Sequence, residues 1–260
     1  MNPFEALLLC LVAFGGSLLT FFSGFGLGTL LMPVLAVFFP IEIAIGMTAI
    51  VHLSNNLFKL ALVGTKAKSD IILRFGIPSV LAALIGAFLL NFLTEIAPLH
   101  TWQWGSHTCT ITPVKLVVAI LLAFFSVFEL VPRLRHWQVD QRYMIHGGLL
   151  SGFFGGLSGH QGALRSAFLM RPGMDKETFI GTGVAIACMT DLARMSIYLG
   201  HWTQLPPETS ITPIILAILS AFAGALIGRR FLRKMGMKTV QNVVGIALLL
   251  FSGLLAAGIV

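Results

Sequence analysis

Long apolar blocks separated by short polar connections dominate the hydrophobic pattern of this chain. Ten apolar segments can be outlined, at about residues 4–22, 29–39, 43–63, 71–93, 113–131, 144–157, 162–170, 178–199, 211–228 and 239–259. A helix needs about 20 apolar residues to cross the hydrocarbon core of a bilayer, and most of these segments are about that long. The pattern predicts an all-α integral membrane protein with about eight to ten membrane helices.

Some of the apolar segments are too short to span a bilayer. At about 1.5 Å per residue, segments 29–39, 144–157 and 162–170 cannot cover about 30 Å. Glycine-rich runs adjoin them, Ser23–Gly28 before the first and Ser158–Gly162 between the other two. We therefore expect short, broken or re-entrant helices at the start of each half of the chain.

The two halves resemble each other when the sequence is shifted by 135 positions. In that register Ser23-Gly24 falls on Ser158-Gly159, Lys59 falls on Arg194, and Pro78 falls on Pro213. We interpret residues 1–132 and 144–260 as two membrane repeats joined by a cytoplasmic connection at 133–143. A duplicated structural membrane protein without a transport role is the alternative to a transporter.

Lysine and arginine indicate the orientation, because short cytoplasmic loops are enriched in both. They cluster at 66–74, 133–142, 171–176 and 229–238, whereas connections 40–42, 94–112 and 200–210 contain neither. This distribution predicts a multi-pass protein of the bacterial cytoplasmic (inner) membrane with both termini extracytoplasmic and Cys109 in an outer connection. Five segments per half is an odd number, so the repeats should be inverted, a recurring plan in secondary transporters.

Composition and charge narrow the class of protein further. Hydrophobic residues make up 57% of the chain and charged residues only 10%, against about 25% charged in soluble domains. The net charge of +7 would suggest nucleic acid in a soluble protein, but here the basic residues follow membrane topology. The lipid bilayer, and not nucleic acid, is the expected partner, and an oligomer is compatible with the sequence.

Arg165 is the most informative charge, because it lies at the start of the short segment 162–170. A helix that starts inside the membrane offers free N–H groups and a positive dipole end, which favour an anion. The other glycine-rich start would face it and complete an anion cage. The candidate substrate-binding residues are Arg165, Ser23, Gly24, Gly26, Gly28, Ser158, Gly159, His160, Gln161 and Gly162. Alternatively, the glycines serve tight helix packing and Arg165 caps a helix carbonyl.

Polar side chains form a stripe on segment 43–63 and a matching one on segment 178–199. Spacings of three and four residues place them on one helical face. The candidate pathway or coupling residues are His52, Asn55, Asn56, Lys59, Asp191 and Arg194. Interhelical hydrogen bonding, and snorkelling of the two basic side chains to opposite interfaces, are the alternatives.

Asp191 is the one acid deep in the apolar segments of the second half. We favour an ion pair with Arg194 or Arg165 over a proton-carrying role, which burial would favour. Nothing in the sequence resembles a metal site, a cofactor or nucleotide-binding loop, or a hydrolase triad. An enzyme is therefore not expected.

Two stretches resemble the TauE/SafE sulfite exporter family of membrane permeases. The first runs from Ser23-Gly24-Phe25-Gly26-Leu27-Gly28 to Asn55-Asn56, and the second is Gly155–Arg165. In the second, common family members carry a glycine-rich stretch ending in proline, where this chain has His160-Gln161 and Arg165. The resemblance covers essentially the whole chain and implies export of sulfite or another small sulfur-containing or organic anion.

Together these features predict a secondary transporter that moves a small anion by alternating access, driven by a proton or ion gradient. A passive anion channel is the first alternative. A membrane-embedded enzyme or assembly factor is the second.

Overall fold

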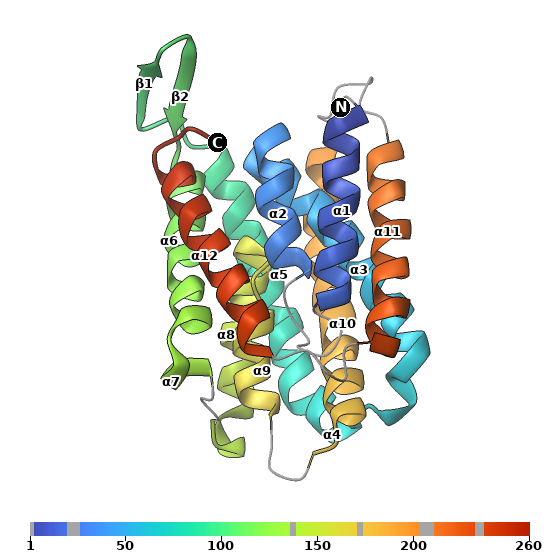
Figure 1. Ribbon diagram of the computed structural model, residues 1–260. Helices are drawn as coiled ribbons and strands as arrows, with labels where there is room; N and C mark the ends of the chain where they lie inside the picture. Colours follow the sequence, from blue (N-terminus) through green and yellow to red (C-terminus); the bar gives the residue numbers. More distant parts are fainter. Residues whose placement is uncertain (1–2, 20–26, 136–138, 171–173, 203–210, 232–236) are drawn as a thin grey trace.

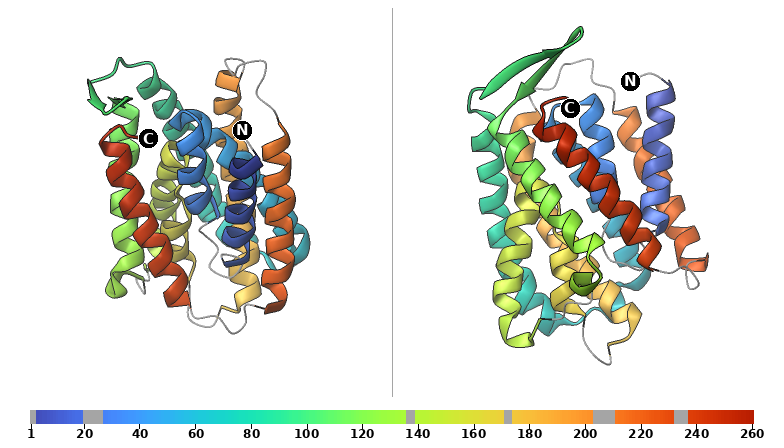
Figure 2. Two further views of the ribbon diagram at one scale, coloured as in Figure 1. Left: turned by 45° about the horizontal axis from the view of Figure 1, so that its top comes forward. Right: turned by 60° about the vertical axis from the view of Figure 1, so that its left-hand side comes forward.

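The computed structural model describes residues 3–19, 27–135, 139–170, 174–202, 211–231 and 237–260. Its main helices run roughly along one common direction and form a single bundle (Figures 1 and 2). They are α1 (Pro3–Leu19), α2 (Leu27–Phe38), α3 (Ile41–Val63), α5 (Ile77–Thr94), α6 (Pro113–Leu130), α8 (Met144–Ser158), α9 (Gly162–Leu169), α10 (Lys176–Trp202), α11 (Thr212–Phe231) and α12 (Met237–Ala256). Each corresponds to one predicted apolar segment.

Shorter elements join the main helices. The single turns are η1 (Gly64–Lys66), α4 (Ser69–Ile71), α7 (Pro132–Arg135) and η3 (Gln141–Tyr143). A π-helical stretch, η2 (Ile72–Gly76), continues α4 directly into α5, so that residues 69–94 form one apolar helix of 26 residues.

The lengths and surfaces of the helices are those of a membrane protein. Five helices in the described part of the chain are long and apolar enough to cross a membrane, while α1, α2 and the apolar part of α12 are shorter. Large apolar side chains point outward from the bundle, among them Phe88 (68% exposed), Ile120 (67%) and Leu250 (67%). Such a surface suits lipid, because soluble monomers rarely expose large contiguous apolar patches.

A β-hairpin lies where the sequence predicted only an outer connection. Strands β1 (His100–Trp104) and β2 (His107–Ile111) pair antiparallel, and Gly105 takes the turn with a φ of 62°. The indole of Trp102 donates to the Ala257 carbonyl at 2.9 Å and ties the hairpin to the end of α12. Cys109 is in the hairpin but only 2% exposed, so its thiol is packed away from solvent.

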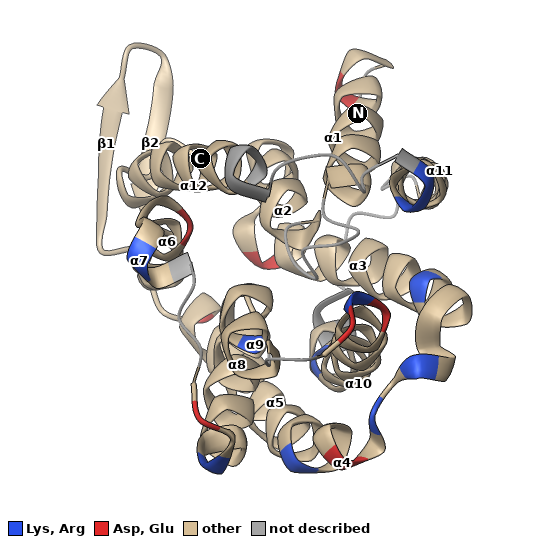
Figure 3. Cartoon of the chain, turned by 60° about the horizontal axis from the view of Figure 1, so that its bottom comes forward, with Lys and Arg blue, Asp and Glu red and all other residues tan. Residues whose placement is uncertain are grey.

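The hairpin and both chain ends lie at one end of the bundle (Figure 1). Exposed basic residues lie on the elements that meet at the opposite end, which Figure 3 brings forward. They are Lys66, Lys68, Arg74, Arg133, Arg142, Lys176, Arg229 and Arg230. This separation matches the predicted split of the basic clusters from the outer connections, while the direction of the bundle in a membrane stays a prediction.

The packing of the two halves is reciprocal. Helix α5 packs on α8 and α1 on α11; α3 packs on α11 and α10 on α5; α2 packs on α12 and α6 on α9. The α1–α2 pair enters from the end with the termini, and the α8–α9 pair enters from the other end (Figure 1). Two inverted repeats would pack in this way, although the repeat itself remains an inference from the sequence.

Candidate functional site

The break between α8 and α9 positions most of the candidate residues. Gly159 ends α8 with a left-handed φ of 80°, a conformation that favours glycine. The hydroxyl of Ser158 donates back to the Phe154 carbonyl, so it is used within α8. After Gln161 the chain resumes as α9 near mid-height of the bundle, close to the level at which α2 starts (Figure 1).

Asp191 of α10 is the centre of a buried hydrogen-bonded cluster. Its carboxylate lies 2.6 Å from His52 Nδ1 on α3 and 2.8 Å from Arg194 Nη2 on the next turn of α10. Gln161 Nε2 donates to it at 3.0 Å from the α8–α9 junction, and the Asn56 amide donates at 3.4 Å. The predicted ion pair therefore forms, with Arg194.

Arg194 is held inside the protein. It is 1% exposed, its Nε donates to Asp191 at 3.0 Å, and its Nη1 donates to the Gly155 carbonyl at 3.2 Å. One turn further along α10, the Tyr198 hydroxyl donates to the Gly156 carbonyl. These contacts join α10 to α8 and rule out snorkelling of Arg194 to an interface.

The stripe on α3 faces the bundle interior, as predicted, but it divides between two sides. His52 and Asn56 face Asp191 on α10, whereas Asn55 faces α1 and α11. In the amide orientation that satisfies its neighbours, Asn55 donates to the Ala221 carbonyl at 3.3 Å and accepts from Lys59 Nζ at 3.3 Å. Lys59 is only 5% exposed, so this side chain does not snorkel either.

Arg165 lies in the first turn of α9 and is 2% exposed. Its Nε lies beside Gly183 of α10, 3.6 Å from the position that a Cβ there would occupy. Arg165 is also close enough to Lys59 and Asp191 for electrostatic interaction. Helices α3, α9 and α10 thus each contribute a buried basic residue, Lys59, Arg165 and Arg194, and Arg165 is in electrostatic range of both Lys59 and the Asp191 carboxylate.

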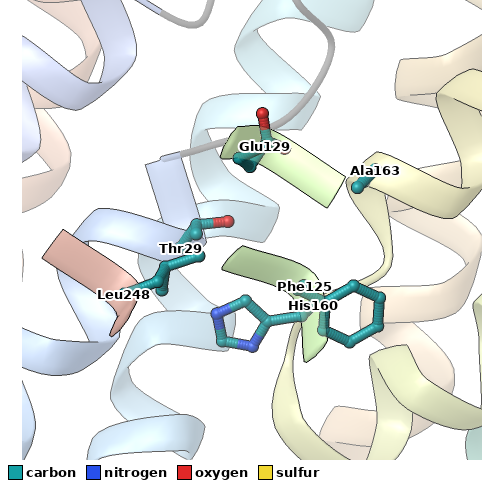
Figure 4. Close-up of a pocket in the computed structure, with 7 residues that line it drawn as sticks. Thr29, Phe125, Glu129, His160, Ala163 and Leu248 are labelled. Atoms are coloured by element: carbon teal, nitrogen blue, oxygen red, sulfur yellow. The ribbon is translucent and has the colours of Figure 1, made fainter. Parts of the chain in front are cut away.

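The starts of α2 and α9 meet at a small cavity. It is lined by Thr29, Phe125, Glu129, His160, Gly162, Ala163 and Leu248 (Figure 4). The two helix starts therefore come together, as the cage hypothesis required. Arg165 is not among the residues that line the cavity and faces α10 instead. The residues that the cage hypothesis grouped together therefore lie in two places, a cationic cluster and a separate cavity.

The other candidate glycine start is only partly described. Ser23, Gly24 and Gly26 lie outside the described residues. Gly28 packs against α3, where a Cβ would meet Thr48 and His52 at an ordinary 3.5 Å. Its position therefore has room for alanine.

Sequence reasoning did not assign site roles to Phe125, Glu129 and Tyr198, and it counted Thr29 only for its backbone amide in the first glycine-rich start. An acid within an apolar segment is a signal in itself, and Glu129 is 4% exposed on α6. Phe125 and Thr29 carry no such signal, since each is ordinary in a membrane helix.

These features define the class of the protein, a polytopic helical membrane protein with a positively charged cluster buried between broken and continuous helices. The chain belongs to the family described as sulfite exporter TauE/SafE, which it matches over residues 8–255. Because this is a transporter family, the protein is a transporter and not an enzyme. No match is found among curated proteins or among solved structures.

Proposed function

We propose that this protein exports a small oxyanion, sulfite or a close sulfur-containing or organic relative, by alternating access. The anion would bind where α3, α9 and α10 converge, beside Arg165 and Lys59. Family membership supports export of sulfite or a related anion in general terms. The identity of the anion and the alternating mechanism are our inference.

The concentration of buried basic residues is the observation that carries this proposal. Lys59 (5% exposed), Arg165 (2%) and Arg194 (1%) are buried, and Arg165 lies within electrostatic range of both Lys59 and Asp191. Asp191 pairs with Arg194, and Lys59 and Arg165 add two further basic groups to the same part of the bundle. Basic residues inside a membrane protein commonly mark a substrate or ion pathway, and such a concentration of basic groups would attract an anion.

Geometry also favours an oxyanion over other negatively charged ligands. The guanidinium of Arg165 presents a planar fork of donors that matches an oxyanion. Helix α9 begins three residues before Arg165, and its start contributes a partial positive charge.

We place both chain ends outside the cell and the exposed basic end in the bacterial cytoplasm.

Binding and exchange measured on the purified protein test the proposal. Titration with sulfite, thiosulfate, sulfate, alkanesulfonates and carboxylates should identify one class that binds, with sulfite or a relative preferred. In proteoliposomes, that anion on the far side should accelerate efflux of labelled anion, because a carrier exchanges faster than it resets. Efflux without acceleration or saturation would favour a channel, and no binding by any anion would contradict the proposal.

A further inference from the structure

The cavity between α2 and α9 has a chemistry different from that of the cationic cluster. His160 projects into it from the α8–α9 junction (Figure 4) and is 4% exposed. Its Nδ1 lies 2.7 Å from the Ser158 carbonyl, which can only accept, so Nδ1 carries the proton. In the neutral ring, Nε2 is then an acceptor, and it is buried without a hydrogen-bond partner among the described residues.

An anion does not suit this lining. Glu129 adds a carboxyl group, Thr29 adds a hydroxyl, and no lysine or arginine is among the described residues that line the cavity. The cavity has room for about one water molecule, so it is too small to hold sulfite. A buried acceptor nitrogen beside an acid and a hydroxyl is instead suited to a water molecule or a proton.

We propose that this cavity is a proton-binding site at which His160 Nε2 takes up a proton delivered by water. An O–H bond of a hydronium ion breaks, an N–H bond forms at Nε2 and the ring becomes an imidazolium, while the remaining neutral water molecule returns to solvent. Nothing is oxidised or reduced. As a site, the cavity is independent of the proposed function; its coupling to anion movement rests on that function.

The groups that face His160 decide how well a proton is held. Glu129 on α6 contributes a carboxyl group whose negative charge, when it is ionised, would stabilise the imidazolium, while Arg194 on α10 and His52 on α3 are the titratable neighbours across the junction. The Phe125 ring stacks on the imidazole with a centroid distance of 5.9 Å and an interplanar angle of 16°. Its face attracts a cation, and α2 and α12 contribute Thr29 and Leu248, which do not titrate.

The chain itself connects this site to the cationic cluster. His160 is followed directly by Gln161, whose amide donates to Asp191, and Arg165 lies on the next helix. A charge on His160 therefore changes the electrostatic field at the anion site. It also acts on the α8–α9 junction, which contains Gln161 as well. Binding of the anion and of the proton should be linked.

Histidine NMR tests the site without any anion. In protein labelled at the histidine rings, one signal should titrate on lowering the pH from about 8 to about 4, the range in which histidine changes charge in proteins. His160→Asn should remove that signal, and His107→Asn, on the exposed hairpin, should remove a different one. If the His160 signal stays neutral throughout, the proposal is wrong.

A second variant protects the test against misfolding of His160→Asn. Glu129→Gln keeps the shape of the side chain but loses its charge, so it should move the titration midpoint of the His160 signal without removing it. An unmoved midpoint would show that Glu129 does not share the site and would overturn the proposed proton site.

Coupling is measured by calorimetry of anion binding in buffers with different ionisation enthalpies. The wild type should take up or release protons on binding, the His107→Asn control should match it, and His160→Asn should show no linkage. Linkage unchanged in His160→Asn would overturn the coupling. Absence of anion binding in the wild type would instead contradict the proposed function and leave the NMR result to decide on the proton site.

Discussion

His52 Nδ1 on α3 and a carboxylate oxygen of Asp191 on α10 lie 2.6 Å apart, although 139 residues separate them in the chain. This contact joins the two halves of the molecule at the level of the broken helices. Arg194 and Gln161 bind the same carboxylate, so Asp191 connects α3 to both α10 and the α8–α9 junction.

Asp191→Asn should destabilise the protein and remove anion binding together with uphill transport. The substitution leaves Arg194 buried without its carboxylate, and breaking one side of a buried ion pair typically lowers the free energy of unfolding by about 3–5 kcal/mol. Thermal unfolding in detergent and transport in proteoliposomes measure the two effects. A stable variant that exchanges anion but cannot concentrate it would show that Asp191 carries a proton.

A double variant separates charge balance from geometry. Asp191→Asn with Arg194→Gln removes both charges of the pair, so it should recover part of the stability that Asp191→Asn loses alone. Asp70→Asn, at an exposed carboxylate of α4, should leave the unfolding temperature unchanged. Equal losses in the single and the double variant would argue against a direct ion pair.

Arg165→Ala should weaken binding of the transported anion by about ten- to a hundredfold. A hydrogen bond to a charged group contributes about 1.5–3 kcal/mol, and about 1.4 kcal/mol corresponds to tenfold in affinity. Arg165→Lys keeps the charge but not the planar fork, so it should recover only part of the affinity. Arg142→Ala, on the exposed end of the bundle, is the control, and unchanged affinity in Arg165→Ala would remove Arg165 from the site.

Gly152→Ala should lower the free energy of unfolding by about 1–3 kcal/mol, the usual range for overpacking. A Cβ at Gly152 would clash with the Ser79 carbonyl oxygen of α5. Because that oxygen is a backbone atom, relieving the clash requires the two helices to move apart. Gly253→Ala on α12 is the matched control, because nothing lies within 4 Å of the added methyl group. Equal stability of the two variants in thermal unfolding would contradict the close contact between α5 and α8.

Ser106→Cys in a Cys109→Ala background should react with an impermeant thiol reagent applied to intact cells. Ser106 is exposed at the tip of the hairpin, whereas the native Cys109 thiol is buried and would report poorly. Lys68→Cys, at the opposite end of the bundle, should react only after lysis. The reverse pattern would invert the proposed orientation.

The sequence predicted the main helices well, because each of them coincides with one apolar segment. The break after Ser158 was visible in its glycines, and the Asp191–Arg194 pair in a spacing of three residues. The hairpin was overlooked, although the alternation around Gly105-Ser106 is a recognisable strand signal. The length of the apolar segments therefore predicted the bundle, whereas the hairpin is indicated only by a short alternation of residue types in a polar connection.

The site was harder to predict, because it depends on which faces of the helices meet. Arg165 and His160 are five positions apart on one junction, and the sequence grouped them into one cage. In the structure, Arg165 faces α10 while His160 faces α2 and α6. The backbone conformation of the junction and the rotation of α9 about its axis separate the two, and hydrophobic patterning encodes neither of them around an eight-residue helix.

The glycines of α8 have a mechanical consequence. Gly148 brings α8 into backbone contact with η2, Gly152 and Gly156 bring it into contact with α5, and Gly224 does the same for α11 against α1. Backbone contact this close leaves no room for side chains between the two helices, so we expect each pair to behave as one rigid unit. Each of these two pairs, α5–α8 and α1–α11, contains one helix from each half of the sequence. In the alternating access that we propose, each moving body would therefore combine helices from both halves of the sequence.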